Sequence, residues 1–292
     1  MTARIIDGSA IAAQVRAEVA TEVAALVADG HRPPHLTAVL VGDDAASATY
    51  VRLKHRDCGE VGMTSSTEAL PSSTTQAELL EVIHRLNADD SIDGVIIQKP
   101  IPSNIDNALI DATLSPLKDA DGLGPISLGL LVQGQPGFVP ATPAGIQQLL
   151  LRSDIDPAGK HVVIVGRSTL IGRPLALLLS AKAPGANATV TIAHTGTTDL
   201  GAITREADIL VAAAGRLNLI TADMVRPGAV VIDVGTNRVD DPSKRTGYRL
   251  AGDVDFEAVK EIASAITPVP GGVGPMTRAM LLVNTLKAAK AE

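Results

Sequence analysis

Residues 161–182 read HVVIVGRSTLIGRPLALLLSAK and decide the fold of the second half of the chain. The apolar run 161–165 predicts a buried strand, and residues 169–182 predict a helix. Between them, Gly166 lets the backbone turn without a side-chain clash, and Gly172 lets the helix lie close to the strand and to a ligand. The free N–H groups at such a helix start can bind a diphosphate. The spacing differs from the usual G-x-G-x-x-G, so a tight turn without a ligand stays an alternative.

Strands and helices alternate after this turn. Strands are expected at 188–193, 209–214 and 229–234, with a short helix at 201–207. Such a βαβ array is typical of a nucleotide-binding domain, which we expect to span residues 143–274.

The residues that follow the second of these strands indicate which dinucleotide fits. An NAD site places Asp or Glu there to hold the ribose 2′-hydroxyl, but here the strand is followed by His194 and Thr195. Arg167 and Arg173 lie in the glycine turn and can meet a 2′-phosphate, which favours NADP. For Arg173, a solvent-exposed side chain that binds no ligand stays an alternative. Arg167 is the better candidate because it directly follows the glycine at the turn.

The first part of the chain shows a second alternation of strands and helices. Helices are expected at 9–29, about 47–58 and 75–88, and strands at 36–41, about 62–68 and 94–98. The order predicts a mainly parallel sheet with helices on its faces. We therefore expect a two-domain α/β protein, with an N-terminal catalytic domain and a Rossmann-like domain.

The domain boundary is expected in a stretch with weak periodicity. Residues 99–143 are rich in Pro and Gly and predict a functional loop or a linker, followed by a bridging helix at 143–152. The last residues, 276–291, predict a helix. We place the first domain at 1–142 and expect the C-terminal helix, within 275–292, to return to it.

Composition excludes several classes of protein. The 25 Lys and Arg residues against 32 Asp and Glu give a net charge of −7, which argues against nucleic-acid and membrane-surface binding. The single cysteine, Cys58, excludes an intrachain disulfide and a thiolate zinc cluster, and we expect no metal site. Without a signal peptide or a run of ~18 apolar residues, the protein is expected to be soluble and cytoplasmic.

Three polar residues of the first half are candidates for chemistry. Tyr50 and Lys54 share one face of a predicted helix, where a partly desolvated lysine has a lowered pKa useful for proton transfer. An ordinary amphipathic helix is the alternative. Gln98 ends a strand, where ligands of open α/β sheets collect, and its amide can orient the lysine or a substrate. An amide bonded only to the backbone is the alternative there.

Two loop segments complete the candidates. Asp121 precedes Gly122 in the inter-domain loop, where a plain turn residue is the simpler interpretation. Residues 268–277, PVPGGVGPMT, combine three prolines and three glycines with apolar side chains. This pattern favours a shaped loop that lines a cleft between domains over a structural connector.

Together these residues resemble the bifunctional methylenetetrahydrofolate dehydrogenase/methenyltetrahydrofolate cyclohydrolase family, called FolD in bacteria. The resemblance covers nearly the whole chain. It rests on AVLVGDDAASATYVRLKHRDCGEVGM (38–63), KDADGL (118–123), VIVGRSTLIGRP (163–174) and above all TPVPGGVGPMT (267–277).

The resemblance implies a role for each matching position. Lys54 matches the catalytic acid/base lysine, Tyr50 the tyrosine that stacks on the folate, Gln98 the glutamine that tunes the lysine, and Asp121 the aspartate that holds the pterin. On the cofactor side stand Gly166, Arg167, Ser168, Gly172, Arg173, His194, Thr195 and Thr236. The substrate side further includes Pro100, Gly271, Gly272 and Pro275.

The implied chemistry has two steps. Hydride passes from 5,10-methylenetetrahydrofolate to NADP, and water then opens the methenyl product to 10-formyltetrahydrofolate. The first step needs mainly placement, and the second needs proton transfer, in which Lys54 would act. The partners are folate and NADP, and the family implies a homodimer formed through the nucleotide-binding domain.

The chain departs from the family pattern beside the expected cleft. The departures are Lys99, Gly124, Ser127 and Ala141, where the family commonly has Leu, His, Asn and Cys. Because of these departures, two alternative functions stay open. The chain could be a divergent family member with one weakened activity, or a non-catalytic protein that binds folate or NADP. Tyr-x-x-x-Lys also marks short-chain dehydrogenases, but there the glycine turn precedes the tyrosine, whereas here it follows.

Overall fold

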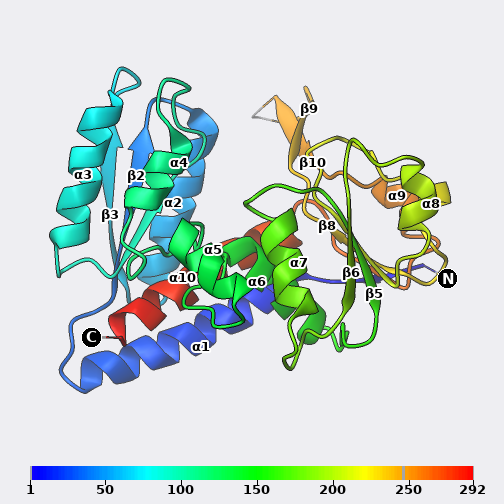
Figure 1. Cartoon of the computed structure of the whole chain (residues 1–292), viewed down its shortest axis with the longest axis horizontal. Coiled ribbons are helices and arrows are strands. Elements are labelled where there is room, and N and C mark those ends of the chain that lie inside the picture. Colours follow the sequence, from blue (N-terminus) through cyan, green and yellow to red (C-terminus); the bar gives the residue numbers. More distant parts are fainter. Residues whose placement is uncertain (1, 245–246, 292) are drawn as a thin grey trace. The chain divides into compact units, whose positions relative to one another are not determined.

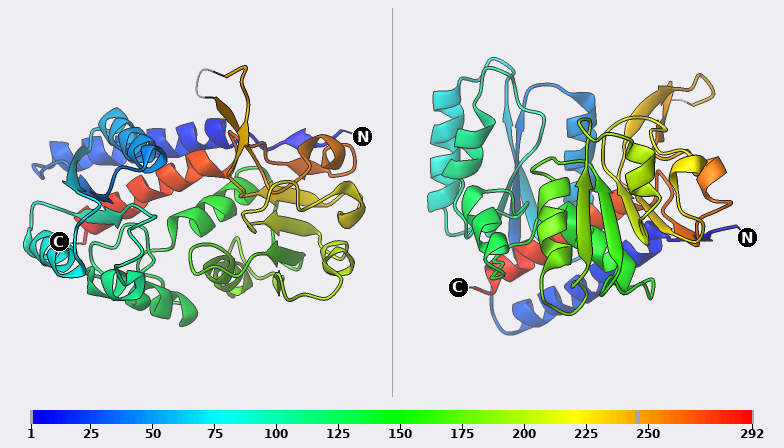
Figure 2. Two further views of the ribbon diagram at one scale, coloured as in Figure 1. Left: turned by 90° about the horizontal axis from the view of Figure 1, so that it is seen from above. Right: turned by 45° about the vertical axis from the view of Figure 1, so that its right-hand side comes forward.

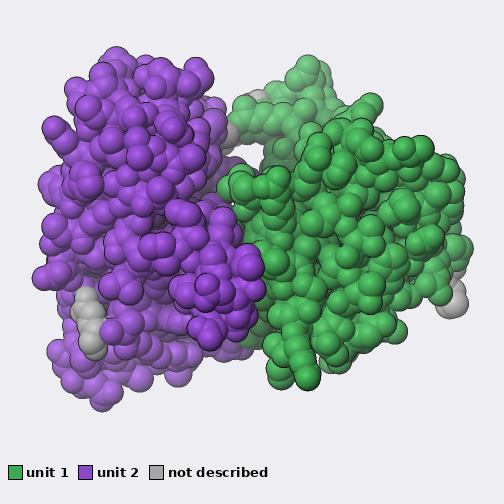
Figure 3. All heavy atoms as spheres, in the orientation of Figure 1, with its two compact units in different colours: residues 1–12, 142–277 green, residues 13–141, 278–292 purple. Residues whose placement is uncertain are grey.

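The computed structural model describes residues 2–244 and 247–291 (Figure 1). The chain forms two compact units, coloured separately in Figure 3. Unit 1 comprises the residues up to Ala12 together with Thr142–Thr277. Unit 2 comprises Ala13–Ala141 and the residues from Arg278 on. Three helices contribute residues to both units: α1 (Gly8–Ala28), α6 (Ala141–Leu151) and α10 (Val273–Ala289).

Unit 2 is built on a parallel sheet with strand order β3-β2-β4. The strands are β2 (His35–Val41), β3 (Thr64–Leu70) and β4 (Gly94–Ile97). The helices are α2 (Ala45–Glu60), α3 (Gln76–Ala88), α4 (Asn107–Thr113) and α5 (Pro125–Val132). Helices α2 and α3 cover opposite faces of the sheet (Figures 1 and 2).

The core of unit 2 explains why α3 forms where the sequence predicts it. Leu79, Ile83 and Leu86 recur at helical spacing and are buried against the sheet. A capping box between Thr75 and Glu78 begins the helix. Helix α10 returns to this unit and lies beside α1 (Figure 2), where Lys290 Nζ is 2.5 Å from Glu22 Oε2.

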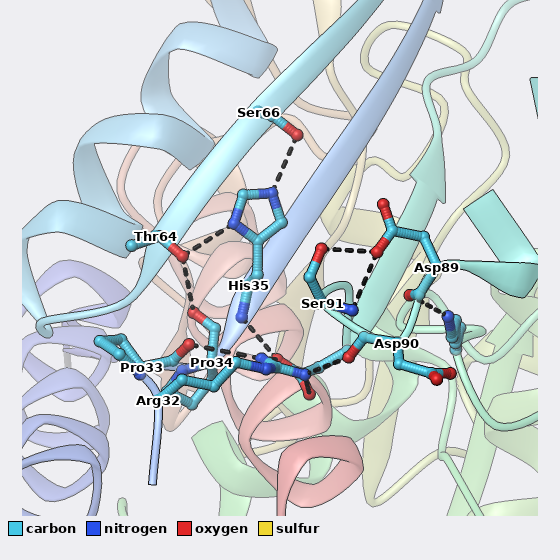
Figure 4. Close-up of polar contacts among 11 residues, drawn as sticks. Arg32, Pro33, Pro34, His35, Thr64, Ser66, Asp89, Asp90 and Ser91 are labelled. Carbon is cyan, nitrogen blue, oxygen red and sulfur yellow. Dashed lines mark hydrogen bonds and ion pairs between the residues drawn. The ribbon is translucent and has the colours of Figure 1, made fainter. Parts of the chain in front are cut away.

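Polar side chains hold the starts of β2 and β3 together (Figure 4). The ring of His35 lies 2.7 Å from Thr64 Oγ1 and 2.9 Å from Ser66 Oγ. Buried Asp93 accepts hydrogen bonds from Arg32 and from the backbone N–H of His35. Burial lowers the pKa of His35, so a neutral ring is favoured in this cluster.

Unit 1 contains a six-stranded sheet in the order β1-β11-β8-β7-β5-β6, with all neighbours parallel. Its strands are β1 (Arg4–Ile5), β5 (His161–Val165), β6 (Thr189–Ala193), β7 (Ile209–Ala212), β8 (Val230–Asp233) and β11 (Ala265–Ile266). The hairpin β9 (Asn237–Asp240) and β10 (Tyr248–Ala251) is separate. The short helices are α7 (Gly172–Ser180), α8 (Leu200–Thr204), α9 (Phe256–Val259) and the 3₁₀ turn η1 (Ala222–Met224).

The predicted two-domain α/β fold with a Rossmann-like half is confirmed, but some local predictions were wrong. Residues 99–143 are not a continuous loop, because they contain α4 and α5. Pro125 at the start of α5 suits a helix, but eight residues are too few for a clear periodic pattern. Helix α10 begins at Val273 instead of residue 276, and β4 ends at Ile97, one residue before Gln98.

Among the described residues, no helix is both long and apolar enough to cross a membrane.

Candidate functional site

Helix α2 presents the first candidate residues of unit 2. Asp44 caps this helix by accepting a hydrogen bond from the backbone N–H of Ser47 at 2.7 Å. Tyr50 and Lys54 follow one helical turn apart. The Tyr50 side chain is exposed and Lys54 is half-buried, so the helix offers a ring to a ligand beside a partly desolvated amine.

Gln98 directly follows β4 and contacts Lys54. Lys54 Nζ donates a hydrogen bond to Gln98 Oε1 at 3.1 Å. The other end of the amide is fixed, since Gln98 Nε2 donates to the backbone oxygen of Lys99 at 2.8 Å. Burial lowers the pKa of Lys54, while the nearby Asp121 carboxylate acts in the opposite direction.

Asp121 is the third member of this group and lies in a loop that is fixed by close packing at Gly122 and by hydrogen bonds from α10. Burial raises the pKa of Asp121, and the Lys54 ammonium opposes that shift. Gly122 has φ +69°, and a Cβ there would lie 2.8 Å from Pro140 N. Helix α10 secures the loop through Asn284 Nδ2, which donates to the backbone oxygens of Ala120 and Val139 at 2.8 and 3.0 Å.

Buried Asp119 orders the continuation of the same loop. Its carboxylate accepts hydrogen bonds from Leu123 N at 3.2 Å and Gly124 N at 2.8 Å. Ser127 Oγ, in the first turn of α5, donates to Asp119 Oδ2 at 2.7 Å. The arrangement of Lys54, Gln98 and Asp121 on this support is suited to proton transfer, because an amine with a lowered pKa gives up its proton more readily than an ordinary lysine.

The glycine turn of unit 1 connects β5 to α7 and has no room for a side chain at Gly166 or Gly172. Gly166 has φ +144°, and a Cβ there would lie 2.2 Å from the carbonyl oxygen of Ala213. A Cβ at Gly172 would lie 2.1 Å from the carbonyl oxygen of Gly166. Ser168 Oγ accepts a hydrogen bond from Ile171 N at 3.1 Å and shapes the turn. The resulting close approach of helix to turn is the geometry that a diphosphate site needs.

Arg167 and His194 meet where β5 and β6 end. Arg167 Nη1 lies 3.4 Å from His194 Nε2, and His194 Nδ1 accepts a hydrogen bond from Gly196 N at 3.0 Å. Thr195 and Arg173 are exposed in the same half of the structure. No carboxylate stands at positions 194–195, directly after β6.

The segment after β8 is ordered by hydrogen bonds to two buried carboxylates, Asp233 and Asp253. Asp233 accepts hydrogen bonds from the backbone N–H groups of Gly235, Asp253 and Val254. Burial raises the pKa of Asp233 to about 6, although these hydrogen bonds act against the shift. Asp253 in turn accepts from Ala214 N at 2.7 Å. The exposed Thr236 is therefore carried by a segment with a defined backbone.

The glycines of the segment 268–277 pack on the start of α1. A Cβ at Gly8 would lie 1.9 Å from the carbonyl oxygen of Gly272, and Ser9 N donates to the oxygen of Gly271 at 3.0 Å. Gly271 itself has φ +107°, which favours glycine. These contacts explain the two glycines structurally, while their predicted role in substrate binding stays a prediction.

Comparison with known proteins covers both units. Residues 6–121 match the catalytic domain of the family described as tetrahydrofolate dehydrogenase/cyclohydrolase, and residues 140–292 match its NAD(P)-binding domain. The chain belongs to this family.

Relatives of the tetrahydrofolate dehydrogenase/cyclohydrolase family match along the whole chain. The bifunctional protein FolD of Salinibacter ruber is 56% identical, with 99% of this chain and 96% of the relative covered. That of Rhodopirellula baltica is 52% identical, with 99% and 98% covered. The structure of FolD from Campylobacter jejuni aligns with a TM-score of 0.92 at 44% identity, covering 98% of each chain.

A related structure in the tetrahydrofolate dehydrogenase/cyclohydrolase family was solved with ligands. FolD of Trypanosoma brucei, in complex with NADP cofactor and inhibitor, aligns with a TM-score of 0.94 at 40% identity. The alignment covers 100% of this chain and 98% of the other.

For this family member, the structure brings together some predicted site residues and not others. Lys54, Gln98 and Asp121 form one group in unit 2, with Tyr50 one turn away on α2. Arg167 and His194 form a pair in unit 1. Next to this pair in sequence, the glycine turn contains Gly166, Ser168, Gly172 and Arg173, and Thr195 follows His194. The remaining candidates are Pro100 in unit 2 and Thr236, Gly271, Gly272 and Pro275 in unit 1.

Sequence reasoning missed the residues that support these groups. Asp119 stands in the segment KDADGL with no pattern that singles it out, yet it is 2% exposed and orders the loop of Asp121. Asp57, one turn after Lys54, was not singled out, although it is fully buried and paired with Arg278. A charged residue at the buried position of an amphipathic helix is the signal that could have identified Asp57.

Proposed function

We propose that the chain oxidises 5,10-methylenetetrahydrofolate with NADP and then hydrolyses the methenyl product to 10-formyltetrahydrofolate. These are the two activities for which its family is named. The observation that carries the assignment of residues is the contact between Lys54 Nζ and Gln98 Oε1, made beside Asp121.

In the hydrolytic step, Lys54 moves protons. Water adds to the methenyl carbon and loses a proton to the neutral Lys54 amine, which its lowered pKa makes available. The carbon–N5 bond then breaks, N5 takes up a proton from the Lys54 ammonium, and the new hydroxyl releases its proton to solvent as it becomes the formyl oxygen. The balance is one water consumed and one proton released. Gln98 Oε1 holds the lysine in place during both transfers.

In the oxidative step, the protein supplies placement. NADP accepts the hydride when bound. We assign Asp121 to hydrogen-bond the pterin and the exposed Tyr50 ring to stack on the folate, which together would orient the methylene carbon. Pro100, Gly271, Gly272 and Pro275 are proposed to contribute on the substrate side.

The pair Arg167 and His194 supports NADP over NAD. Since His194 Nδ1 accepts from Gly196 N, the hydrogen of the neutral ring lies on Nε2. The Arg167 guanidinium, 3.4 Å away, carries only donors. Two donors this close are both satisfied by an anionic oxygen, and a ribose 2′-phosphate supplies one. Ser168, Arg173 and Thr195 are proposed to bind the phosphates, Thr236 is proposed to lie on the nicotinamide side, and the homodimer stays a prediction.

A coupled time course tests the proposal. Purified protein is mixed with 5,10-methylenetetrahydrofolate and NADP, in parallel with NAD, and reduced nicotinamide and methenyl product are followed separately. We expect reduced cofactor without methenyl accumulation beyond the uncatalysed control, and a preference for NADP. Lys54→Met should accumulate methenyl product that clears only spontaneously. Absence of cofactor reduction would refute the proposal and favour a non-catalytic binding protein.

A further inference from the structure

A buried ion pair lies one turn beyond Lys54 on α2. Asp57 is fully buried, and Arg278 Nε of α10 lies 2.6 Å from its Oδ2 atom. The Arg278 side chain is 15% exposed, so both partners are largely withdrawn from water. The pair joins α2 to α10 within unit 2. Because an isolated buried charge is costly, each partner restricts where the other can lie.

A second guanidinium group contacts Asp57 from its own helix. Arg56 Nη2 also contacts Asp57, at 3.0 Å from Oδ1, but its side chain is 56% exposed and therefore well screened. Arg56 is also paired with Glu60, whose Oε1 atom lies 3.3 Å from Arg56 Nε. The less screened of the two guanidinium groups, Arg278, disfavours the charged form of Lys54.

Among the described residues, the other groups that contact Lys54 or act on its charge come from three parts of unit 2. Gln98 Oε1 follows β4, Asp121 lies in the loop before α5, and the Cys58 thiol lies on α2 itself. Burial raises the pKa of Cys58 to about 12, so the thiol stays neutral in the working range. Asp121 and Arg278 therefore act on the lysine in opposite directions.

We propose that the Asp57–Arg278 pair is a positioning device for Lys54, which holds a guanidinium charge beside the lysine and sets the pH range of the cyclohydrolase step. Asp57 fixes the position of the Arg278 guanidinium, and this positive charge favours loss of the proton from the Lys54 ammonium. The inference rests on the proposed role of Lys54, but neither Asp57 nor Arg278 contacts substrate or reacting atoms in it.

Charge removal at the two positions should move the pH profile in opposite directions. Arg278→Met removes the positive charge, so Lys54 keeps its proton to higher pH and the cyclohydrolase profile shifts upward. Asp57→Asn removes the negative charge, but the Asn oxygen still accepts the hydrogen bond from Arg278, so the guanidinium stays in place uncompensated and the profile shifts downward. Each shift should be on the order of half a pH unit or more. Arg278→Lys keeps the charge and should shift the profile least.

The experiment measures kcat/KM of cyclohydrolase against pH for the whole protein and these three variants. Thermal unfolding and the dehydrogenase rate report whether each variant folds. The double variant Asp57→Asn/Arg278→Met, which has no unpaired buried charge, provides a folded reference if a single variant is unstable. Its profile should lie between those of the single variants.

A readout without turnover separates this inference from the proposed function. The pH dependence of Lys54 labelling by an amine-reactive reagent, followed by mass spectrometry, reports the protonation of the lysine directly. Opposite shifts in labelling support the inference even if the chain lacks cyclohydrolase activity. Shifts of the two variants in the same direction, or unchanged profiles in folded variants, would overturn it and leave the pair a structural contact only.

Discussion

Gln98 presents its carbonyl oxygen, and not its amide nitrogen, to Lys54. The orientation follows from the second hydrogen bond of the amide, since Nε2 donates to the backbone oxygen of Lys99 at 2.8 Å and leaves Oε1 to accept from Lys54 Nζ at 3.1 Å. The backbone N–H of Gln98 donates to Val39 O at 2.9 Å and ties the residue to the sheet. The lysine is therefore held by a neutral acceptor on a rigid support.

Gln98→Glu should slow the cyclohydrolase step. A carboxylate beside the ammonium stabilises the charged lysine and raises the pKa of Lys54, so less neutral amine is available at neutral pH. We expect a loss of about 100-fold in cyclohydrolase kcat at neutral pH, at the lower end of the range of about 10²- to 10⁴-fold usual for general acid–base groups, with partial recovery at higher pH. Steady-state rates against pH measure this. Gln98→Met is the matched control, and a carboxylate variant that shows no recovery at high pH would contradict the explanation.

Arg167→Ala should reduce the preference for NADP over NAD. The variant loses one of two donors assigned to the 2′-phosphate, and a charge-assisted hydrogen bond contributes about 1.5–3 kcal/mol. We therefore expect kcat/KM for NADP to fall by about 10- to 100-fold, with that for NAD nearly unchanged. Arg205→Ala, at an exposed arginine that donates to the backbone oxygen of Asp223, is the control. Equal losses with both cofactors would show that Arg167 does not read the 2′-phosphate.

Gly172→Ala should destabilise unit 1 and impair cofactor binding. The new Cβ would lie 2.1 Å from the carbonyl oxygen of Gly166, which requires the turn or α7 to move. We expect a loss of about 1–3 kcal/mol in the free energy of unfolding, typical of overpacking, together with a raised KM for NADP. Gly129→Ala, in α5 with open space at its Cβ, should instead stabilise by about 0.5–1 kcal/mol. Urea unfolding of both variants provides the comparison.

Gly124→His tests the idea of a divergent copy. The family pattern has His at this position, but a Cβ here would lie 3.0 Å from Asp119 Oδ2 and 3.3 Å from the carbonyl oxygen of Asp111. We expect the single change to cost about 1–3 kcal/mol in stability and to raise neither activity, because the loop is built around glycine. Both activities and thermal unfolding should be measured, alone and with Ser127→Asn. A gain in either activity would favour a copy weakened by these departures.

Asp233 should make stability depend on pH. Its pKa in the folded protein is about 6, above the unfolded value of 3.8. The unfolded state therefore releases the proton first as pH rises, and this group lowers stability progressively between those two values. The whole effect is about 3 kcal/mol. We therefore expect the free energy of unfolding of Asp233→Asn, measured in urea relative to the unchanged protein, to be higher at about pH 7 than at about pH 4. An unfolding difference independent of pH would refute the raised pKa.

Much of the architecture followed from local patterns. The run HVVIV, the two glycines of the turn and the apolar spacing of α3 each specify their elements by nearest-neighbour sterics and periodicity. The same is true of Tyr50 and Lys54, whose shared face follows from helical spacing alone. These features were predictable because each depends on residues close together in sequence.

Other features lay beyond sequence patterns because they join distant segments. Strands β1 and β11 have only two residues each and form by pairing at the edge of an existing sheet. Burial of Asp119 and its hydrogen bonds to Gly124 and Ser127 became visible only in the folded loop. Neither a strand of two residues nor a satisfied buried carboxylate leaves a periodic signal.

The sequence by itself therefore determined the α/β fold, the family and the residue types available for chemistry. Tertiary structure decided which charges act on Lys54. Arg278 is 221 residues from Asp57, and only folding brings α10 to α2. Electrostatic shifts depend on distance and burial in space, and neither quantity can be read from spacing along the chain.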